Sequence, residues 1–377
     1  MLENGKISPR QTGELMFITI LATAILFVPA ITAELAGHDA WLATLAGSFI
    51  GLVTLWMVTW LGHKHPGQTL FAYAETILGK WLGKLLGLAY VWLFVQITAI
   101  IVREFGDFMT TSFMPNTPLS AFNLSLLVVA VWAVLAGLEV ISRMNEFLIL
   151  LLVTILVSVI LLSTPNWELT YLLPFFANGP LPILVASAVP SSFMGEIILL
   201  ATILPFMTRP ERALLAGGAA VVGSAALLTL AIVGSLAVFG PELVASFSFP
   251  LHLFVRSISI GQLLTRFEVL VMVTWVAGVF IKTSVFLYCA SLGLAEILGL
   301  SQYRPVVLPL GIIITVFSIS FFQSVVDVKE FIGQTFPPYF AIFSLGLPSL
   351  LIVVTVVREK IFGTTFTQSA PDKINKG

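Results

Sequence analysis

The fold is decided by the stretch Val189-Pro190-Ser191-Ser192-Phe193-Met194-Gly195-Glu196, which lies in an apolar run of about 25 residues, Leu181 to Pro205. A run of this length can cross a lipid bilayer as a helix. Proline removes a helix hydrogen bond, and backbone groups freed at membrane depth must be satisfied by protein or by a wet cavity. We therefore predict a spanning helix that breaks near Pro190, with Glu196 just past the break. The alternative is an ordinary proline kink whose serines bond back to their own helix.

Composition places the chain among polytopic α-helical membrane proteins. Hydrophobic residues make up 58% of the 377 residues, and charged residues only 10%. A soluble domain of this length could not hide so much apolar surface in one core. The net charge of −1 provides no basic surface for nucleic acid. The lipid bilayer is therefore an expected partner, and nucleic acid is not.

We predict ten membrane spans in a single transmembrane domain of residues 1–377. The spans cover approximately residues 12–36, 40–61, 81–106, 119–140, 146–163, 181–205, 211–238, 265–298, 305–324 and the segment from Pro337-Pro338 to Val357. Residues 69–78 should form an amphipathic helix at the interface, and residues 240–264 are too interrupted to span. A polar tail follows at residues 359–377.

The distribution of lysine and arginine orients these spans. An even number of spans places both termini on one side, together with 13 basic residues: Lys6, Arg10, Lys64, Lys80, Lys84, Arg143, Arg209, Arg212, Arg304, Arg358, Lys360, Lys373 and Lys376. The opposite side has four: Arg103, Arg256, Arg266 and Lys329. Because short basic loops remain in the cytoplasm, both termini are predicted to be cytoplasmic.

The two halves of the chain share a plan. In both halves a proline in the first span is followed by a glutamate. Span 1 contains Ile25-Leu26-Phe27-Val28-Pro29, and Glu34 follows five residues after Pro29. Span 6 contains Pro190, and Glu196 follows six residues after it. Each half also places a non-spanning connector between its second and third spans. Because five spans is an odd number, the repeats of about residues 8–163 and 178–358 must be inverted. This five-plus-five plan with helices 1 and 6 broken is typical of secondary transporters, which bind substrate between the broken helices.

The candidate ligand site lies between the two predicted breaks. Its walls are small and apolar, as suits a small aliphatic amino acid. We assign ligand binding to residues of span 1 (Thr23, Ala24, Ile25, Phe27), of span 6 (Ser191, Ser192, Phe193, Met194, Gly195, Glu196) and of span 3 (Gln96). Pro29 and Pro190 have structural roles as the breaks. The alternative for Gln96 is a hydrogen bond between helices.

Lys282 lies about halfway along span 8. A lysine at the bilayer centre costs about 2.5–3.5 kcal/mol on insertion scales, so it should face the bundle interior and have a partner. We expect a structural or coupling role for Lys282, with Glu196 as a candidate partner. The alternative is a lysine that bonds to exposed carbonyl groups at a helix end.

Other polar residues give weaker signals. Arg103, Glu104 and Asp107 close span 3 at its outer end, where we expect a solvated or paired rim or a gate. His63 and His65 are two residues apart, a poor spacing for a metal site on a helix. The sequence lacks a His-Glu-x-x-His motif, a phosphate-binding glycine loop and paired membrane aspartates. We therefore expect neither enzyme activity nor a metal or cofactor.

Several motifs in order resemble one family. They are Lys6-Ile7-Ser8-Pro9-Arg10-Gln11, the Ile25–Pro29 stretch, Glu75-Thr76-Ile77-Leu78-Gly79-Lys80, Phe193-Met194-Gly195-Glu196 followed by Pro205, and Arg266-Phe267-Glu268 through Trp275 to Lys282. Over residues 6–360 the chain resembles the B subunit of bacterial spore germinant receptors. That family is similar to the amino acid–polyamine–organocation transporters, which implies a LeuT-like fold.

The resemblance implies a function as well as a fold. It implies a multi-pass protein of the spore inner membrane that senses small nutrients such as amino acids, beside an A subunit and a lipoprotein C subunit. In sodium-coupled relatives of the fold, residues at the level of Thr283 and Ser284 contribute oxygen atoms that bind a sodium ion. We assign Thr283 to the ligand site and Ser284 to coupling. We expect the Lys282 ammonium group to occupy the place of that sodium ion and to bridge span 8 to span 1. The protein should then not depend on sodium. Thr23-Ala24-Ile25-Leu26 departs from the wider superfamily because it lacks glycine.

Three functions remain open on this basis. The first is a receptor subunit in which a nutrient bound between spans 1 and 6 shifts an equilibrium that partner subunits read. The second is a proton-coupled amino acid transporter in which Glu196 or Lys282 titrates. The third is an ion or water conduit that the partner complex opens.

Overall fold

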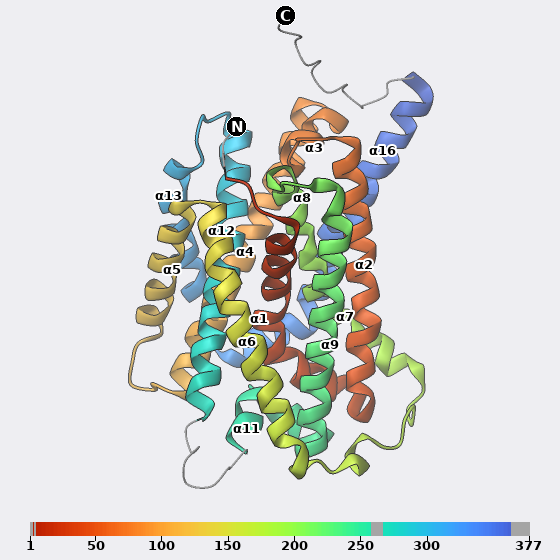
Figure 1. The fold of residues 1–377 in the computed structure, drawn as a ribbon, viewed down its shortest axis with the longest axis vertical. Helices are drawn as coiled ribbons and strands as arrows, with labels where there is room; N and C mark the ends of the chain where they lie inside the picture. Colours follow the sequence, from red (N-terminus) through yellow and green to blue (C-terminus); the bar gives the residue numbers. More distant parts are fainter. Residues whose placement is uncertain (1–2, 4, 258–266, 363–377) are drawn as a thin grey trace, which may run out of the picture.

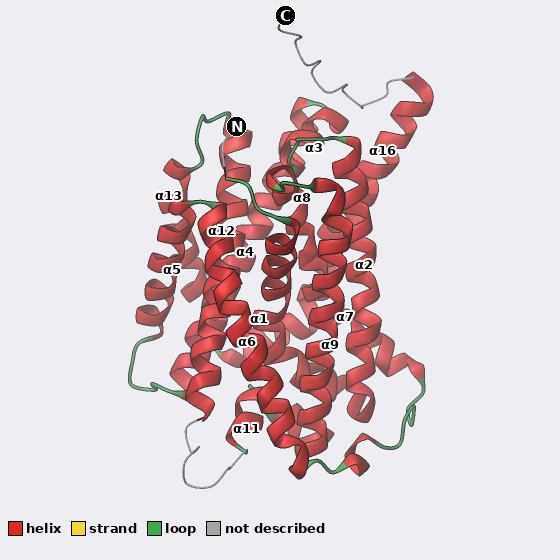
Figure 2. Cartoon of the chain, viewed as in Figure 1, coloured by secondary structure: helices red, strands yellow, loops and turns green. Residues whose placement is uncertain are grey.

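The chain folds into a bundle of helices (Figures 1 and 2). The structure, a computed structural model, describes residue 3, residues 5–257 and residues 267–362. Across this part of the chain every regular element is a helix, and Ile7 and Met207 form an isolated bridge. The predicted all-α class is therefore confirmed.

The predicted spans are present. Within the described residues, eight stretches are long and apolar enough to cross a membrane. The first of these, Pro9–Lys64, contains two helices, and the shorter apolar helix Arg304–Ser320 brings the number of candidate spans to ten. The first half consists of α1 (Pro9–Ala36), η1 (Gly37–Asp39), α2 (Ala40–Lys64), α3 (Leu70–Leu78), α4 (Lys80–Ser112), α5 (Leu119–Ala136), α6 (Leu138–Ser163), η2 (Thr164–Asn166) and η3 (Leu169–Leu172). Helix α3 matches the short helix predicted at residues 69–78, and its location at the membrane interface stays a prediction.

The second half completes the bundle. Span 6 consists of α7 (Pro180–Gly195), η4 (Glu196–Leu199), α8 (Leu200–Ile203) and η5 (Leu204–Phe206). The following elements are η6 (Pro210–Arg212), α9 (Ala213–Phe239), α10 (Pro241–Ser246), α11 (Pro250–Arg256), α12 (Phe267–Leu298) and α13 (Arg304–Ser320). Span 10 consists of α14 (Val325–Glu330), η7 (Phe331–Thr335), α15 (Phe336–Ala341), η8 (Ile342–Gly346) and α16 (Leu347–Phe362). Residues 258–266, including Arg266, and residues 363–377, including Lys373 and Lys376, lie outside the described residues.

Helix α1 forms the centre of the bundle. It packs against α9, α7 and α12, and most of its side chains are buried. Helices α5 and α6 lie on the outside, where Trp132 and Phe147 are 75% and 76% exposed, as expected for faces that contact lipid. Helix α1 begins and α16 ends at the end of the bundle where α3 lies, and α11 lies at the opposite end (Figure 1).

The start of α1 is fixed both locally and by span 6. Ser8 accepts a hydrogen bond from the backbone of Gln11, whose side chain accepts one from the Ser8 N–H, so the two residues form a capping box. The Ile7 N–H donates to Phe206 O at 2.9 Å, and the Thr208 N–H donates to Ile7 O at 2.9 Å. These bonds hold the start of span 1 against the end of span 6.

The predicted break in span 1 is wrong, because α1 runs without interruption from Pro9 to Ala36 with Pro29 inside it. Proline removes a single N–H here, and the absence of glycine from Thr23 to Val28 leaves no residue that favours an unwound backbone. The buried Thr32 hydroxyl donates to Val28 O at 2.7 Å within the same turn. Packing on all sides keeps the helix wound.

Span 6 is interrupted, but in a different place and way from the prediction. Pro190 lies inside continuous α-helix, and the winding tightens to a 3₁₀ helix at Glu196. Pro190 is accommodated because Gly47 of α2 faces it: a Cβ at Gly47 would lie 3.0 Å from Pro190 Cγ and 2.8 Å from Ser191 N. A 3₁₀ turn inside a longer helix frequently marks a hinge.

Span 10 begins earlier than predicted and contains wide turns. It starts at Val325, where Ser324 and Asp327 form a capping box, and it continues through Pro337-Pro338. A π-helical turn, Phe331–Thr335, ends two positions before these prolines. Two missing N–H groups disturb the regular ladder at this point, and the extra residue of a π-turn absorbs the disturbance.

Candidate functional site

Lys282 connects three spans at the centre of the bundle. Its ammonium group donates to Thr23 Oγ1 of α1 at 2.9 Å and to Glu196 Oε1 of η4 at 2.8 Å. The side chains of Lys282 and Glu196 are 0% and 1% exposed. The expected bridge from span 8 to span 1 is thus present, and Glu196 is the partner. We call Thr23, Glu196 and Lys282 the central triad.

Aromatic rings complete the surroundings of the Lys282 ammonium group. It lies 5.3 Å from the ring centre of Phe193 and 5.9 Å from that of Phe286, within the range of cation–π attraction. Because a buried ion pair gives up its hydration, the pair is favourable only while both partners and their hydrogen bonds are in place. The central triad is therefore sensitive to any movement of α1, η4 or α12.

A cavity of about 10 Å³ lies beside the central triad, and we call it the central cavity. This volume is close to the space needed by one water molecule. The cavity is lined by Thr23 of α1, by Ile97, Ile100, Ile101 and Glu104 of α4, by Phe193 and Glu196 of span 6, and by Phe331, Ile332 and Phe336 of span 10. Three phenylalanine rings thus cover a small space that contains two carboxyl groups.

Glu104 is the residue of this cavity that the sequence interpretation misplaced. It is 2% exposed and does not belong to a solvated rim. The sequence contained the necessary signal, because positions 97, 100, 101 and 104 follow helical spacing and must share one face of α4. The contribution of Phe331 and Ile332 could not be foreseen, since it depends on the π-turn of span 10.

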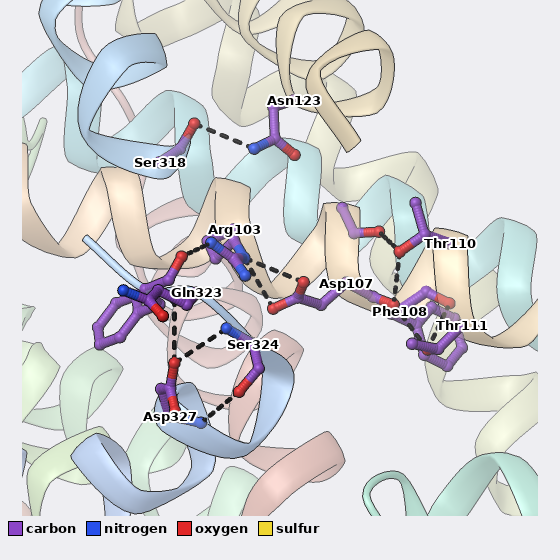
Figure 3. A network of polar contacts seen from close by, with 12 residues as sticks. Arg103, Asp107, Phe108, Thr110, Thr111, Asn123, Ser318, Gln323, Ser324 and Asp327 are labelled. Carbon is purple, nitrogen blue, oxygen red and sulfur yellow. Dashed lines mark hydrogen bonds and ion pairs between the residues drawn. The ribbon is translucent and has the colours of Figure 1, made fainter. Parts of the chain in front are cut away.

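Arg103 and Asp107 form a buried pair toward the C-terminal end of α4 (Figure 3). Arg103 Nε donates to both Asp107 oxygens at 2.9 Å, and Arg103 Nη1 donates to Phe322 O in the connection between α13 and α14. The N–H groups of Gln323 and Ser324 donate to Asp327 in the same connection. The predicted pairing is present, but the pair is buried, and it attaches span 3 to the start of span 10.

The other span 1 candidates do not line the central cavity. Ala24 and Phe27 are fully buried, and Phe27 contacts the ring of Phe249 edge-on at 5.4 Å between ring centres. Ile25 lines a different, mainly apolar cavity of about 30 Å³ between α1, α6, α11 and α12. Pro29 is buried inside α1. Because α1 is continuous, the consecutive residues Thr23, Ala24 and Ile25 point in different directions and do not share one pocket wall.

Most span 6 candidates pack against neighbouring helices. Ser191 and Ser192 donate to Ala188 O, as in the alternative of an ordinary kink. Met194 meets Gly51 of α2, where an added Cβ would lie 2.7 Å from Met194 Cβ. A Cβ on Gly195 would lie 2.9 Å from Phe340 Cε1 and 3.1 Å from Ser344 Cβ. The glycine therefore leaves room for span 10.

The remaining candidates make contacts within and between helices. Gln96 Oε1 accepts a hydrogen bond from the Tyr339 hydroxyl at 2.6 Å, as the alternative for this residue proposed. Thr283 and Ser284 donate to Val279 O and Phe280 O of their own helix. The sequence candidates that the central cavity brings together are Thr23, Phe193 and Glu196. Across the described ranges, no cluster of three or more His, Cys, Asp or Glu side chains is arranged to hold a metal ion.

A second hollow of about 310 Å³ opens near the C-terminal end of span 1 and the start of span 10, and we call it the outer hollow. It is lined by Ile31, Glu34, Leu35, Val326, Lys329, Glu330, Gly333 and Gln334, and Lys329 lies 3.2 Å from Glu34. The π-turn Phe331–Thr335 borders both spaces, because Gly333 lines the outer hollow and Phe331 the central cavity.

Comparison with protein families matches residues 6–326 to the family described as spore germination protein. Spore germination protein KB of Bacillus subtilis (strain 168) is 27% identical over 364 residues, which cover 95% of this chain and 97% of that protein. Spore germination protein A2 of the same organism is 25% identical over 367 residues, 94% of this chain and 97% of that protein.

Solved structures of transporters are similar in fold. MhsT in complex with L-phenylalanine has a TM-score of 0.64 at 15% identity, over 96% of this chain and 95% of that chain. Mhp1, a nucleobase-cation-symport-1 family transporter, has a TM-score of 0.72 at 14% identity, over 97% of this chain and 82% of that chain. Both have the LeuT fold, so the predicted LeuT-like fold is confirmed.

Proposed function

Because the chain belongs to the family of spore germination proteins, we propose that it is the nutrient-sensing subunit of a spore germinant receptor. The proposed ligand is a small amino acid bound at the central cavity, and the proposed readers of the bound state are the A and C subunits. We place the chain in the spore inner membrane with both termini in the cytoplasm, and its two halves as inverted repeats of about residues 8–163 and 178–358.

The observation that carries this proposal is the position of the central triad. Thr23, Glu196 and Lys282 come from three different spans and meet beside the central cavity. A ligand that enters the cavity must contact at least two of these spans at once. Because a ligand shifts an equilibrium only through different contacts in its two states, a site shared by several helices is suited to sensing.

The size of the central cavity supports a coupling between binding and movement. About 10 Å³ is too small for an amino acid, so the rings of Phe193, Phe331 and Phe336 must move before one can bind. A π-turn of span 10 and a 3₁₀ turn of span 6 lie next to these rings, and turns of this kind are common at functional sites and hinges. Ligand binding then favours an arrangement of spans 6 and 10 that partner subunits can recognise.

Spores whose only germinant receptor contains this chain provide the test. The change Ile101→Ala enlarges the central cavity, whereas Phe147→Ala removes a ring from the lipid-facing side of α6. We expect Ile101→Ala to alter which amino acids trigger germination, with larger side chains favoured, and Phe147→Ala to keep the wild-type dose response. An unchanged amino acid preference in Ile101→Ala, at normal protein abundance, would contradict the proposed site.

A second function is a proton-coupled amino acid transporter of the same fold. It is supported by two buried carboxyl groups, Glu104 and Glu196, beside one buried lysine, an arrangement that can exchange a proton. Accumulation of labelled amino acid in liposomes by the purified chain, dependent on a pH gradient, would favour transport. A response that needs the A and C subunits, without accumulation, favours sensing.

A further inference from the structure

Glu104 directs a carboxyl group into the central cavity from α4. It shares one helix face with Ile97, Ile100 and Ile101, all of which line the cavity. Glu104 faces the Thr23 hydroxyl, and its Oε2 atom has no hydrogen-bond partner within the described residues. Carboxylate oxygens that are fully buried and lack a donor are rare in folded proteins. This atom is therefore placed to meet a donor that is not part of the chain.

The nearby cations are already engaged with other residues. Lys282 donates to Glu196 and Thr23, and its positive charge is matched by Glu196. Arg103 is adjacent to Glu104 in sequence but lies on another face of α4, where it pairs with Asp107. The central cavity thus contains two carboxyl groups beside one ammonium group. One further positive charge is needed for an ionised Glu104 to be stable at this depth.

We propose that Glu104 recognises the ammonium group of the ligand. This inference rests on the proposed function, and it names the residue that restricts the ligand to molecules with an ammonium group. An ammonium group is similar in size to a water molecule, so the space beside Glu104 is sufficient for it. The rest of the ligand then takes the space that the phenylalanine rings vacate. The positive charge of the ligand's ammonium group takes the place of the proton that an unpaired buried carboxylate would otherwise bind.

The test uses intact spores that carry the receptor with this chain, exposed to a panel of L-amino acids. For each amino acid that triggers germination, the 2-hydroxy acid with the same carbon skeleton is tested, because it replaces the ammonium group with a hydroxyl group. We expect the 2-hydroxy acids to fail. We expect Glu104→Gln, which removes the charge at constant size, to raise the half-saturating amino acid concentration about tenfold or more, since hydrogen bonds to charged groups contribute this much.

Two variants control for folding. Glu104→Asp keeps the charge and should respond to amino acids at lower concentrations than Glu104→Gln does. Glu211→Gln makes the same chemical change at an exposed position and should behave as wild type. Equal responses of wild type to an amino acid and its 2-hydroxy acid, or a wild-type dose response of Glu104→Gln, would overturn the role of Glu104 while leaving the receptor function intact. If wild-type spores respond to none of the amino acids in the panel, the proposed function is removed, and this inference with it.

Discussion

The Lys282 ammonium group lies 2.8 Å from the Glu196 carboxylate, although the two residues are 86 positions apart in the chain and both side chains are buried. The pair joins the middle of α12 to the place where span 6 first changes its winding. Glu196 begins the 3₁₀ turn, so its carboxyl group and the turn must move together. A change in the helix at this point is therefore transmitted to α12 and, through Thr23, to α1.

We expect Lys282→Met to reduce the abundance of the protein in spore membranes and to abolish the germination response. The substitution leaves Glu196 buried without its counter-charge, which costs about 3–5 kcal/mol. The double substitution Lys282→Met with Glu196→Gln removes both charges and should regain much of the abundance without the response. Immunoblots of spore membranes, together with germination assays, measure both effects.

The matched control is Lys329→Met at the outer hollow. Lys329 also pairs with a glutamate, but Glu34 is 60% exposed, so loss of that pair should cost about 0–1 kcal/mol. Abundance of Lys282→Met equal to that of Lys329→Met would show that the central triad contributes nothing special to stability.

Two arginine–carboxylate pairs with the same spacing allow a second comparison. Arg103–Asp107 and Arg143–Glu139 are both four residues apart on a helix, but the side chains of the first pair are 4% and 8% exposed and those of the second 69% and 41%. We expect Asp107→Asn to destabilise the purified protein by about 3–5 kcal/mol, because Arg103 then stays buried without a counter-charge. Glu139→Gln should cost about 0.3–0.5 kcal/mol, as exposed helix pairs do.

Thermal unfolding of the purified protein in detergent measures this difference. The melting temperature should fall clearly for Asp107→Asn and stay within error for Glu139→Gln. Similar melting temperatures for the two variants would show that burial gives the Arg103–Asp107 pair no larger role in stability than the exposed Arg143–Glu139 pair has.

The sequence predicted the spans and the partner of Lys282 because both follow from strong constraints. Long apolar runs must cross the bilayer, and a charge at mid-depth must find an opposite charge. The winding of the helices follows from packing between distant segments, which one sequence does not display. Pro29 and Pro190 both suggested breaks, yet α1 stays wound in its tight surroundings, and Gly47 of α2 makes room for Pro190. Glu104 could have been placed by helical spacing alone.

Gly195→Ala should weaken the packing of span 6 against span 10 and destabilise the protein, without changing which amino acids are preferred. The added methyl group would lie 2.9 Å from Phe340 Cε1 and 3.1 Å from Ser344 Cβ, and overpacking of this kind costs about 1–3 kcal/mol. The melting temperature of the purified protein should fall, and Ser344→Gly in the same chain should restore part of the loss. A changed order of preference among amino acids, at an unchanged melting temperature, would instead place Gly195 at the ligand.

Germination through this chain should be independent of sodium. The Lys282 ammonium group already supplies a positive charge to Thr23 and Glu196, so these oxygen atoms do not need a sodium ion. Replacement of sodium by choline should leave the half-saturating amino acid concentration of wild-type spores unchanged. The purified variant Lys282→Ala provides a second test. Removal of the lysine side chain opens a space beside the oxygen atoms of Thr23 and Glu196 that the ammonium group contacts. Sodium, but not choline, should bind there and raise the melting temperature of the variant. Wild-type germination that requires sodium would show that an ion binds elsewhere and that the ammonium group has not replaced it.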